Sequence, residues 1–212
     1  MRTGERLARL KNWTYDAICK DRTMKTPSPD GTIAGVTWVE PKVYLGFHPT
    51  RPDVTGQRAP EPVNIVPSVT IMFGQSHAQN MTEQRFDRYD GTHRPKEMGG
   101  ILPVTFLFAV YEPGDRLDRF QDSPVPEYLI EGSEAGLFAL TEWMDDLTAA
   151  LLGAENIPES DLFIWANTLR YSPYTEMDQI ADKRPYYYGF VTCDFGTRTE
   201  RLPNDEFNAL LN

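Results

Sequence analysis

The chain has 212 residues and a mass of 24.2 kDa, with 31 acidic and 21 basic side chains and a formal net charge of −10. Proteins that grip nucleic acid rely on Lys and Arg to neutralise phosphates, so a chain this acidic is not expected to bind a duplex. Residues 1–100 hold 14 basic and 11 acidic side chains (net +3), whereas residues 101–212 hold 7 and 20 (net −13). This division suits contacts between complementary protein surfaces.

The chain is long enough for one hydrophobic core, because a protein of this size buries roughly 70% of its unfolded surface. We therefore expect a single domain over residues 1–212. The longest apolar run, residues 101–111, is shorter than the ~18–20 residues that span a bilayer, so no membrane segment is predicted. Cys19 and Cys193 make no metal framework, and we expect free thiols in a reducing compartment.

The N-terminal part predicts a helix followed by extended segments. Apolar residues three and four apart favour an amphipathic helix from residue 5 to about residue 21. A short extended piece is expected over residues 37–47, where Glu40-Pro41 keeps it at a sheet edge or out of the sheet. Alternating apolar residues predict a strand over residues 63–73, better formed over residues 68–73 because a proline interrupts its first half.

Residues 74–100 are predicted to form an extended loop or arm. The segment is polar, carries both signs of charge and shows no sustained period. Connections that long are uncommon inside compact domains and are usually functional extensions or disordered. Two interpretations stay open, a mobile surface loop and an arm that is ordered against a neighbouring subunit. In the second case the candidate interface residues are Arg85, Arg88 and Arg94.

The strongest strand and helix patterns lie after residue 100. Residues 104–111 are apolar at both alternating positions and predict a central strand covered on both faces. Ser133 is expected to open a helix that Gly153 closes. Its apolar stripe consists of Leu137, Leu140, Met144, Leu147 and Leu151, widened by Phe138 and Leu152. Its outer face carries the acidic candidate interface residues Glu134, Glu142, Asp145 and Asp146.

The last third of the chain predicts one further clear strand. Residues 160–169 favour extended or short helical structure, and residues 171–180 are too mixed to assign. Residues 186–195 predict a strand with one fully apolar face. Residues 197–212 are expected to be a C-terminal tail.

No catalytic, cofactor-binding or metal site is predicted. His48, His77 and His93 do not lie at ligand spacings, and no phosphate-binding glycine loop or nucleophile elbow is present in the sequence. Asp87, Asp90 and His93 surround a glycine and leave a small metal-dependent hydrolase as a lesser alternative. A solvated loop tip is the favoured interpretation, because calcium loops need more carboxylates at a stricter spacing.

Several features follow one another in a characteristic order. An amphipathic helix opens the chain, and a proline-rich connection and apolar strands follow it. A Tyr-x-Pro-Gly turn spans residues 111–114, Glu131-Gly132 introduces the helix, and residues 184–189 read Arg-Pro-Tyr-Tyr-x-Gly. This order resembles the tail-terminator, or tail-completion, proteins of long-tailed bacteriophages. The likeness covers residues 5–20 loosely and 63–196 better, without the insertion at residues 74–100 and without the last 16 residues.

The resemblance implies an α/β fold of the α+β type, with a largely antiparallel sheet and helices on one face. It also implies a homohexameric ring in the virion that caps the tail tube, stops its polymerisation and meets the head–tail connector or stopper protein. DNA would pass through the lumen without specific binding. In such a ring the arm over residues 74–100 would clasp a neighbour or the tube, and the acidic helix would face the channel or meet a basic partner. Such a protein is not an enzyme and needs no cofactor and no membrane. The alternative within the same class is another neck, connector or baseplate subunit.

Overall fold

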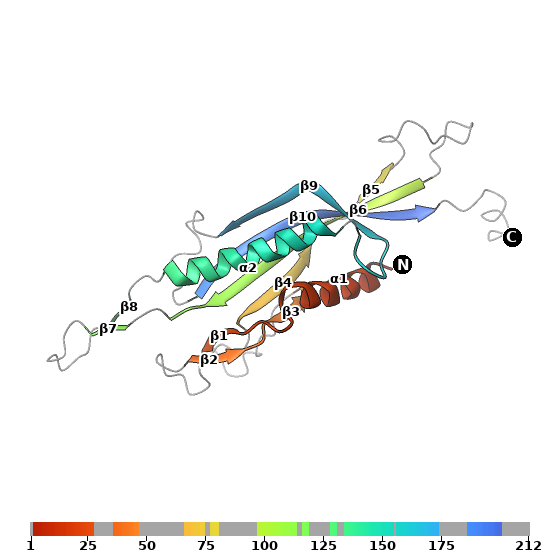
Figure 1. The fold of residues 1–212 in the computed structure, drawn as a ribbon. Helices are drawn as coiled ribbons and strands as arrows, with labels where there is room; N and C mark the ends of the chain where they lie inside the picture. The colour runs from red at the N-terminus through yellow and green to blue at the C-terminus, as the bar shows by residue number, and fades with distance from the viewer. Residues whose placement is uncertain are drawn as a thin grey trace, which may run out of the picture.

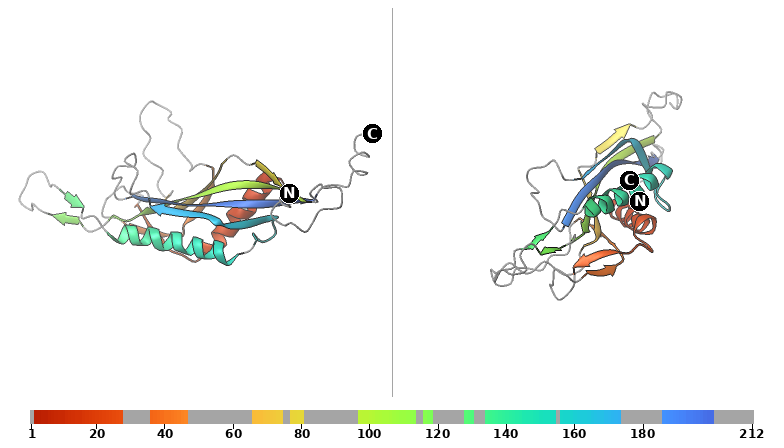
Figure 2. Two further views of the ribbon diagram at one scale, coloured as in Figure 1. Left: turned by 90° about the horizontal axis from the view of Figure 1, so that it is seen from above. Right: turned by 60° about the vertical axis from the view of Figure 1, so that its left-hand side comes forward.

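The computed structural model describes residues 2–27, 36–46, 66–74, 77–80, 97–113, 116–118, 128–130, 134–154, 156–173 and 186–200. Within them, a six-stranded sheet has both helices on one of its faces (Figure 1). Figure 2 shows this sheet from the side, with α2 (Glu134–Gly153) running along one face. The predicted α+β class with a largely antiparallel sheet is confirmed.

Two long antiparallel strands form the centre of the sheet. β6 (Glu97–Tyr111) and β10 (Tyr186–Glu200) pair along their whole length. β9 (Leu162–Pro173) adds to β10 on one side, also antiparallel. On the other side β4 (Ser68–Phe73) pairs antiparallel with β6, as the alternation over residues 68–73 predicted.

The remaining strands complete the edges. β3 (Lys42–Leu45) lies parallel to β4 at the end of the sheet, and β5 (His77–Asn80) pairs with the first part of β6. β1 (Met24–Pro27) and β2 (Val36–Val39) form a separate antiparallel pair. β7 (Arg116–Asp118) and β8 (Tyr128–Ile130) form another.

The extended piece expected over residues 37–47 is divided into two strands that belong to different sheets. β2 ends at Val39, and β3 begins at Lys42 on the far side of Glu40-Pro41. The Glu40 carboxylate accepts hydrogen bonds from the Tyr15 hydroxyl (2.6 Å) and the Asp21 N–H (3.3 Å). These two hydrogen bonds anchor the residues between β2 and β3. The predicted edge position is confirmed for β3, which lies at the edge of the six-stranded sheet.

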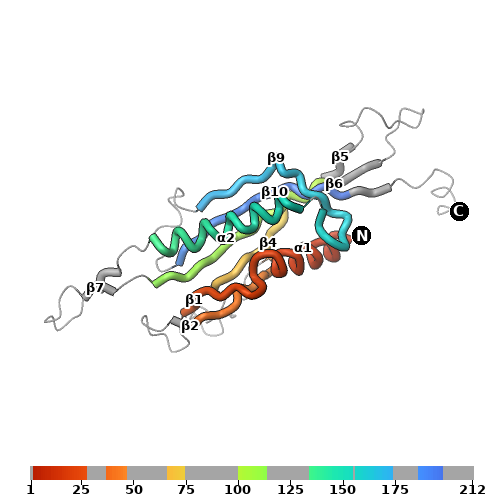
Figure 3. Tube along the Cα trace, viewed as in Figure 1, coloured from red at the N-terminus to blue at the C-terminus, as the bar shows by residue number. Residues whose placement is uncertain are grey.

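Both helices press their apolar side chains onto the same face of the sheet. α1 (Thr3–Ile18) buries Leu7, Leu10 and Ile18, and contacts α2 beside it (Figure 3). In α2 the Trp143 ring meets Phe108 edge-on at 5.1 Å, and its indole N–H donates to the Ile18 carbonyl at 3.0 Å. The core cluster therefore joins α1, α2 and β6 through one buried tryptophan.

The apolar stripe of α2 differs in part from its prediction. Leu140, Met144, Leu147 and Leu151 are buried as expected, whereas Leu137 is half-buried. Trp143 joins the buried side, although the periodicity did not single it out. Phe138 and Leu152 do not widen the stripe, because they lie on the solvent side with exposures of 56% and 59%.

The expectation that β6 is covered on both faces is met in part. Phe106, Phe108 and Val110 point to the helix side and are buried. On the other face Ala109 and Tyr111 are also buried, while Thr105 and Leu107 are half-buried. Both described helices lie on the first face, and Thr192 and Phe190 are cross-strand neighbours on the second.

Strands occupy part of both the predicted loop over residues 74–100 and the predicted tail over residues 197–212, so both predictions need correction. β5 and the first four residues of β6 lie within the first segment, and β10 continues into the second as far as Glu200. Thr197 pairs with Gly100, and its hydroxyl accepts from the Gly100 N–H at 2.9 Å. Residues 81–96 and 201–212 lie outside the described residues. Pairing between strands far apart in sequence extends them where the local pattern is weak.

Candidate interaction surface and pocket

The solvent side of α2 combines acidic and apolar side chains. All four predicted acidic residues, Glu134, Glu142, Asp145 and Asp146, are exposed there. The exposed Phe138 and Leu152 lie among them on the same helix. We call this the α2 outer face and define it by these six residues. Phe138 and Leu152 are 14 positions apart, about 21 Å along the helix axis, so they are two separate apolar contact points within an acidic surface.

The predicted basic contacts cannot be placed beside this surface. Arg85, Arg88 and Arg94 lie outside the described residues, as do the alternative metal ligands Asp87, Asp90 and His93. Among the described ion pairs, Asp146 is the member of the α2 outer face that has a partner, the Arg22 guanidinium at 2.7 Å. The acidic charge of Glu134, Glu142 and Asp145 is therefore not compensated by described residues.

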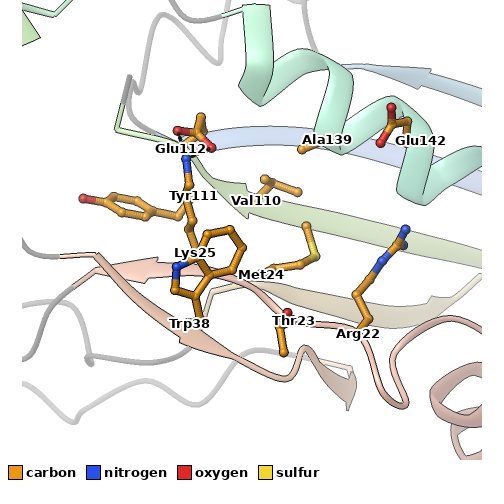
Figure 4. Close-up of a pocket in the computed structure, with 10 residues that line it drawn as sticks. All are labelled: Arg22, Thr23, Met24, Lys25, Trp38, Val110, Tyr111, Glu112, Ala139 and Glu142. Atoms are coloured by element: carbon orange, nitrogen blue, oxygen red, sulfur yellow. Dashed lines mark hydrogen bonds and ion pairs between the residues drawn. The ribbon is translucent and has the colours of Figure 1, made fainter. Parts of the chain in front are cut away.

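A pocket of about 330 Å³ opens beside the α2 outer face (Figure 4). It lies between the β1–β2 pair, the C-terminal end of β6 and the first half of α2. Met24 and Val110 form its buried apolar floor, and Ala139 from α2 adds to it. The floor is formed where β1 packs against β6, and the pocket is the space between these strands and α2.

At one end of the pocket an ion pair lies over the ring of an exposed tryptophan. The Lys25 ammonium donates to both Glu112 carboxylate oxygens, at 2.6 and 2.7 Å. The same nitrogen lies 5.9 Å from the centre of the Trp38 ring, within the range of a cation–π contact. Trp38 is 60% exposed on β2 and forms a wall of the pocket. Lys25 and Glu112 neutralise each other, so this end offers an aromatic surface rather than charge.

The other end carries an unsatisfied donor and a carboxylate. Arg22 binds Asp146 through Nη2, whereas its Nη1 is buried and has no hydrogen-bond partner in the part of the chain that the structure describes. A buried donor left unpaired costs about 1–3 kcal/mol, so an acceptor placed there would stabilise the site. Glu142 lines the same rim (Figure 4). The pocket thus suits a ligand with an apolar group, a hydrogen-bond acceptor and a positive charge.

The described residues assemble no metal site. They contain no group of three or more His, Cys, Asp or Glu side chains able to hold a metal ion. Cys19 and Cys193 are buried free thiols, and burial raises the pKa of Cys19 to about 12 and that of Cys193 to about 11. A thiol held in its neutral form is a poor nucleophile, so neither of these two thiols is activated.

The sequence pointed to the acidic part of this surface but not to the pocket. The acids were visible because helical spacing places them on one side of α2. Arg22, Lys25 and Trp38 carry no local signal, since they become neighbours of Glu112 and Glu142 only through the packing of β1, with its partner β2, against β6. None of the described helices is both long enough and apolar enough to cross a bilayer.

Comparison with known proteins adds no family assignment. A scan against protein-family models finds no match to the chain, and a search of curated proteins finds none either.

Proposed function

We propose that the chain is a structural subunit of a bacteriophage virion, a tail terminator that forms a ring on the tail tube. The ring stops tube polymerisation and joins the tail to the head–tail connector or stopper protein. Its subunits number six, and DNA passes through its lumen without specific binding. The proposal starts from the order of elements in the sequence and from the surface that this fold presents.

The α2 outer face is the observation that carries the proposal. A subunit that functions by assembly needs a surface that keeps the free subunit in solution. Burial of that surface against another protein must also be energetically favourable. Phe138 and Leu152 provide apolar contact area, and the surrounding acids provide solubility and selectivity for a basic partner surface. The described residues present this surface and contain no group of three or more side chains that could hold a metal ion.

The charge distribution supports contact between identical subunits that join head to tail. The excess of negative charge lies after residue 100, and the first hundred residues are slightly basic. In a ring each subunit presents one surface to the preceding neighbour and a different surface to the following one. The interface we propose unites the acids of α2, namely Glu134, Glu142, Asp145 and Asp146, with Arg85, Arg88 and Arg94 of the adjacent subunit.

The assembly state of the purified chain tests the proposal. Mass photometry and negative-stain electron microscopy should show closed rings with the mass of six chains, alone or with the tail tube protein. Adding the chain to polymerising tube protein should give tubes that stop growing and carry a ring at one end. A chain that stays monomeric with and without tube protein would refute the proposal. Rings that leave tube growth unchanged would point to another neck, connector or baseplate subunit.

A further inference from the structure

We propose that the pocket between the β1–β2 pair and α2 receives residues 81–96 of a neighbouring copy of this chain. The inference deepens the proposed function and rests on it, because it names the contact that joins one subunit of the ring to the next. It assigns an occupant to a site that contains an unpaired buried donor, an exposed tryptophan and an uncompensated carboxylate.

The walls of the pocket define what the occupant must contain. A side chain that fills the space between Trp38 and the Met24–Val110 floor has to be apolar or aromatic. A main-chain carbonyl of the same segment would accept the hydrogen bond that Arg22 Nη1 lacks among the described residues. A peptide supplies both groups at once, whereas a small anion would supply only the acceptor.

Charge selects a peptide with basic residues. Asp146 and Glu112 are paired with Arg22 and Lys25, which leaves Glu142 at the rim and Asp145 farther along α2 without described partners. An occupant with arginine beside its apolar anchor would neutralise Glu142 with a charge-assisted hydrogen bond.

Residues 81–96 contain such groups, with four basic side chains against three acidic ones, Glu83, Asp87 and Asp90. The segment contains two aromatic residues, Phe86 and Tyr89, each next to an arginine, Arg85 or Arg88. Arg94 and Lys96 follow within the same stretch. Aromatic residues and arginine are the types that most often anchor protein interfaces. The segment therefore offers an anchor and a cation within four consecutive positions.

The length of β6 excludes the pocket of the same chain. The segment joins Asn80 at the end of β5 to Glu97 at the start of β6, whereas the pocket is bounded by Val110, Tyr111 and Glu112 at the other end of that strand. A strand of 15 residues spans roughly 45–50 Å. A segment that leaves and returns to the same end reaches at most about 30 Å. Only another copy can place residues 81–96 in the pocket.

Figure 1 shows the same separation, with β1 and β2 at one end of the sheet and β5 at the other. A contact between opposite ends of identical subunits joins two different surfaces and is therefore heterologous. It repeats from copy to copy, and it gives a closed ring when the rotation between neighbouring copies divides a full turn evenly. The pocket and the segment would then each be used once by every subunit.

Two variants that are each defective on one side test this arrangement. The pocket variant carries Trp38→Ala and Glu142→Arg, both at exposed positions, and the segment variant carries Arg85→Ala and Arg88→Ala, which cannot pair with the arginine introduced at position 142. Each variant alone should need at least about tenfold more protein than wild type to form rings. Mixed together they should form a 1:1 heterodimer, because the intact segment of the first fits the intact pocket of the second and no further contact can follow.

A variant with the same change in charge elsewhere serves as the control. Asp16→Arg lies on the exposed side of α1, lines a separate hollow beside Val43, and should assemble like wild type. Circular dichroism melting should show that all the variants fold. If wild type forms rings and the pocket variant does too, or if mixing gives no heterodimer, the docking proposal is wrong while the proposed function stands. If wild type forms no ring with or without tube protein, both are wrong.

Discussion

Gly136 sets how closely the start of α2 approaches the sheet. A Cβ atom at this position would lie 2.2 Å from the ring of Tyr187 on β10, closer than any real contact. In an open helix position alanine is favoured over glycine by up to about 1 kcal/mol. Here we predict the opposite sign, because Gly136→Ala must displace an aromatic ring that packs against the core.

The expected loss for Gly136→Ala is about 1–3 kcal/mol of unfolding free energy, measured by urea denaturation. Gly4→Ala is the matched control, since Gly4 also lies in the first turn of a helix and a Cβ there has nothing within 4 Å. The control should leave stability unchanged or slightly raise it. Equal behaviour of the two variants would contradict the assigned contact.

The two thiols should be almost unreactive in the folded protein. Burial is the main cause of the raised pKa values, about 12 for Cys19 and about 11 for Cys193, so little thiolate forms near pH 8. We predict that an aromatic disulfide reagent labels both residues at least about a hundredfold more slowly than it labels a free cysteine. Urea should release two reactive thiols per chain. Rapid labelling of the native protein would show that one thiol is accessible.

At the scale of elements, a charged clamp attaches α1 to the turn before β9. The Arg6 guanidinium donates to both oxygens of Asp161, through Nε at 2.8 Å and Nη2 at 2.6 Å, and Arg9 pairs with Glu159 nearby. The hydrogen bond from Arg6 is the main cause that lowers the pKa of Asp161 below its ordinary value of 3.8. The carboxylate is thus stabilised in its charged form by folding.

The sign of the resulting pH dependence follows from this lowered pKa. The stabilising contribution of Asp161 is complete above the unfolded pKa, and is lost as the pH falls through the lower folded value. Asp161→Asn should lower the melting temperature near pH 7 by an amount equivalent to about 1 kcal/mol and weaken the dependence on pH below about 4. Asp16→Asn is the control, because Asp16 is an exposed carboxylate on α1, the helix that carries Arg6. A steeper acid dependence in Asp161→Asn would oppose the assignment.

At the scale of the whole molecule, the uneven charge predicts assembly that weakens with salt. Raising the ionic strength from about 0.1 M to about 1 M shortens the Debye length from roughly 10 Å to roughly 3 Å, which screens exposed charges. The chain concentration at which half of the rings are dissociated should therefore be higher in strong salt, as measured by mass photometry. Rings whose stability does not depend on salt would show that apolar contacts alone hold the subunits together.

Local patterns in the sequence determined several elements of this protein. The strand over residues 68–73, the main helix ending at Gly153 and its four exposed acids were predicted from periodicity together with local proline and capping signals. This succeeds because each signal lies within one turn or one strand, where the backbone period decides which side chains share a face. The α+β class, which the family resemblance implied, is also confirmed.

Only the tertiary structure decided how far the strands extend, on which face of β6 the described helices pack and where the pocket lies. β6 and β10 pair from Tyr111–Tyr186 to Glu97–Glu200, and this pairing turns segments without a clear pattern into strands. The pocket draws on Arg22, Trp38, Glu112 and Glu142, which are far apart in the chain. Contacts between distant residues depend on how the elements pack, and no local period records them, so the sequence determined the elements and their charge while packing created the pocket.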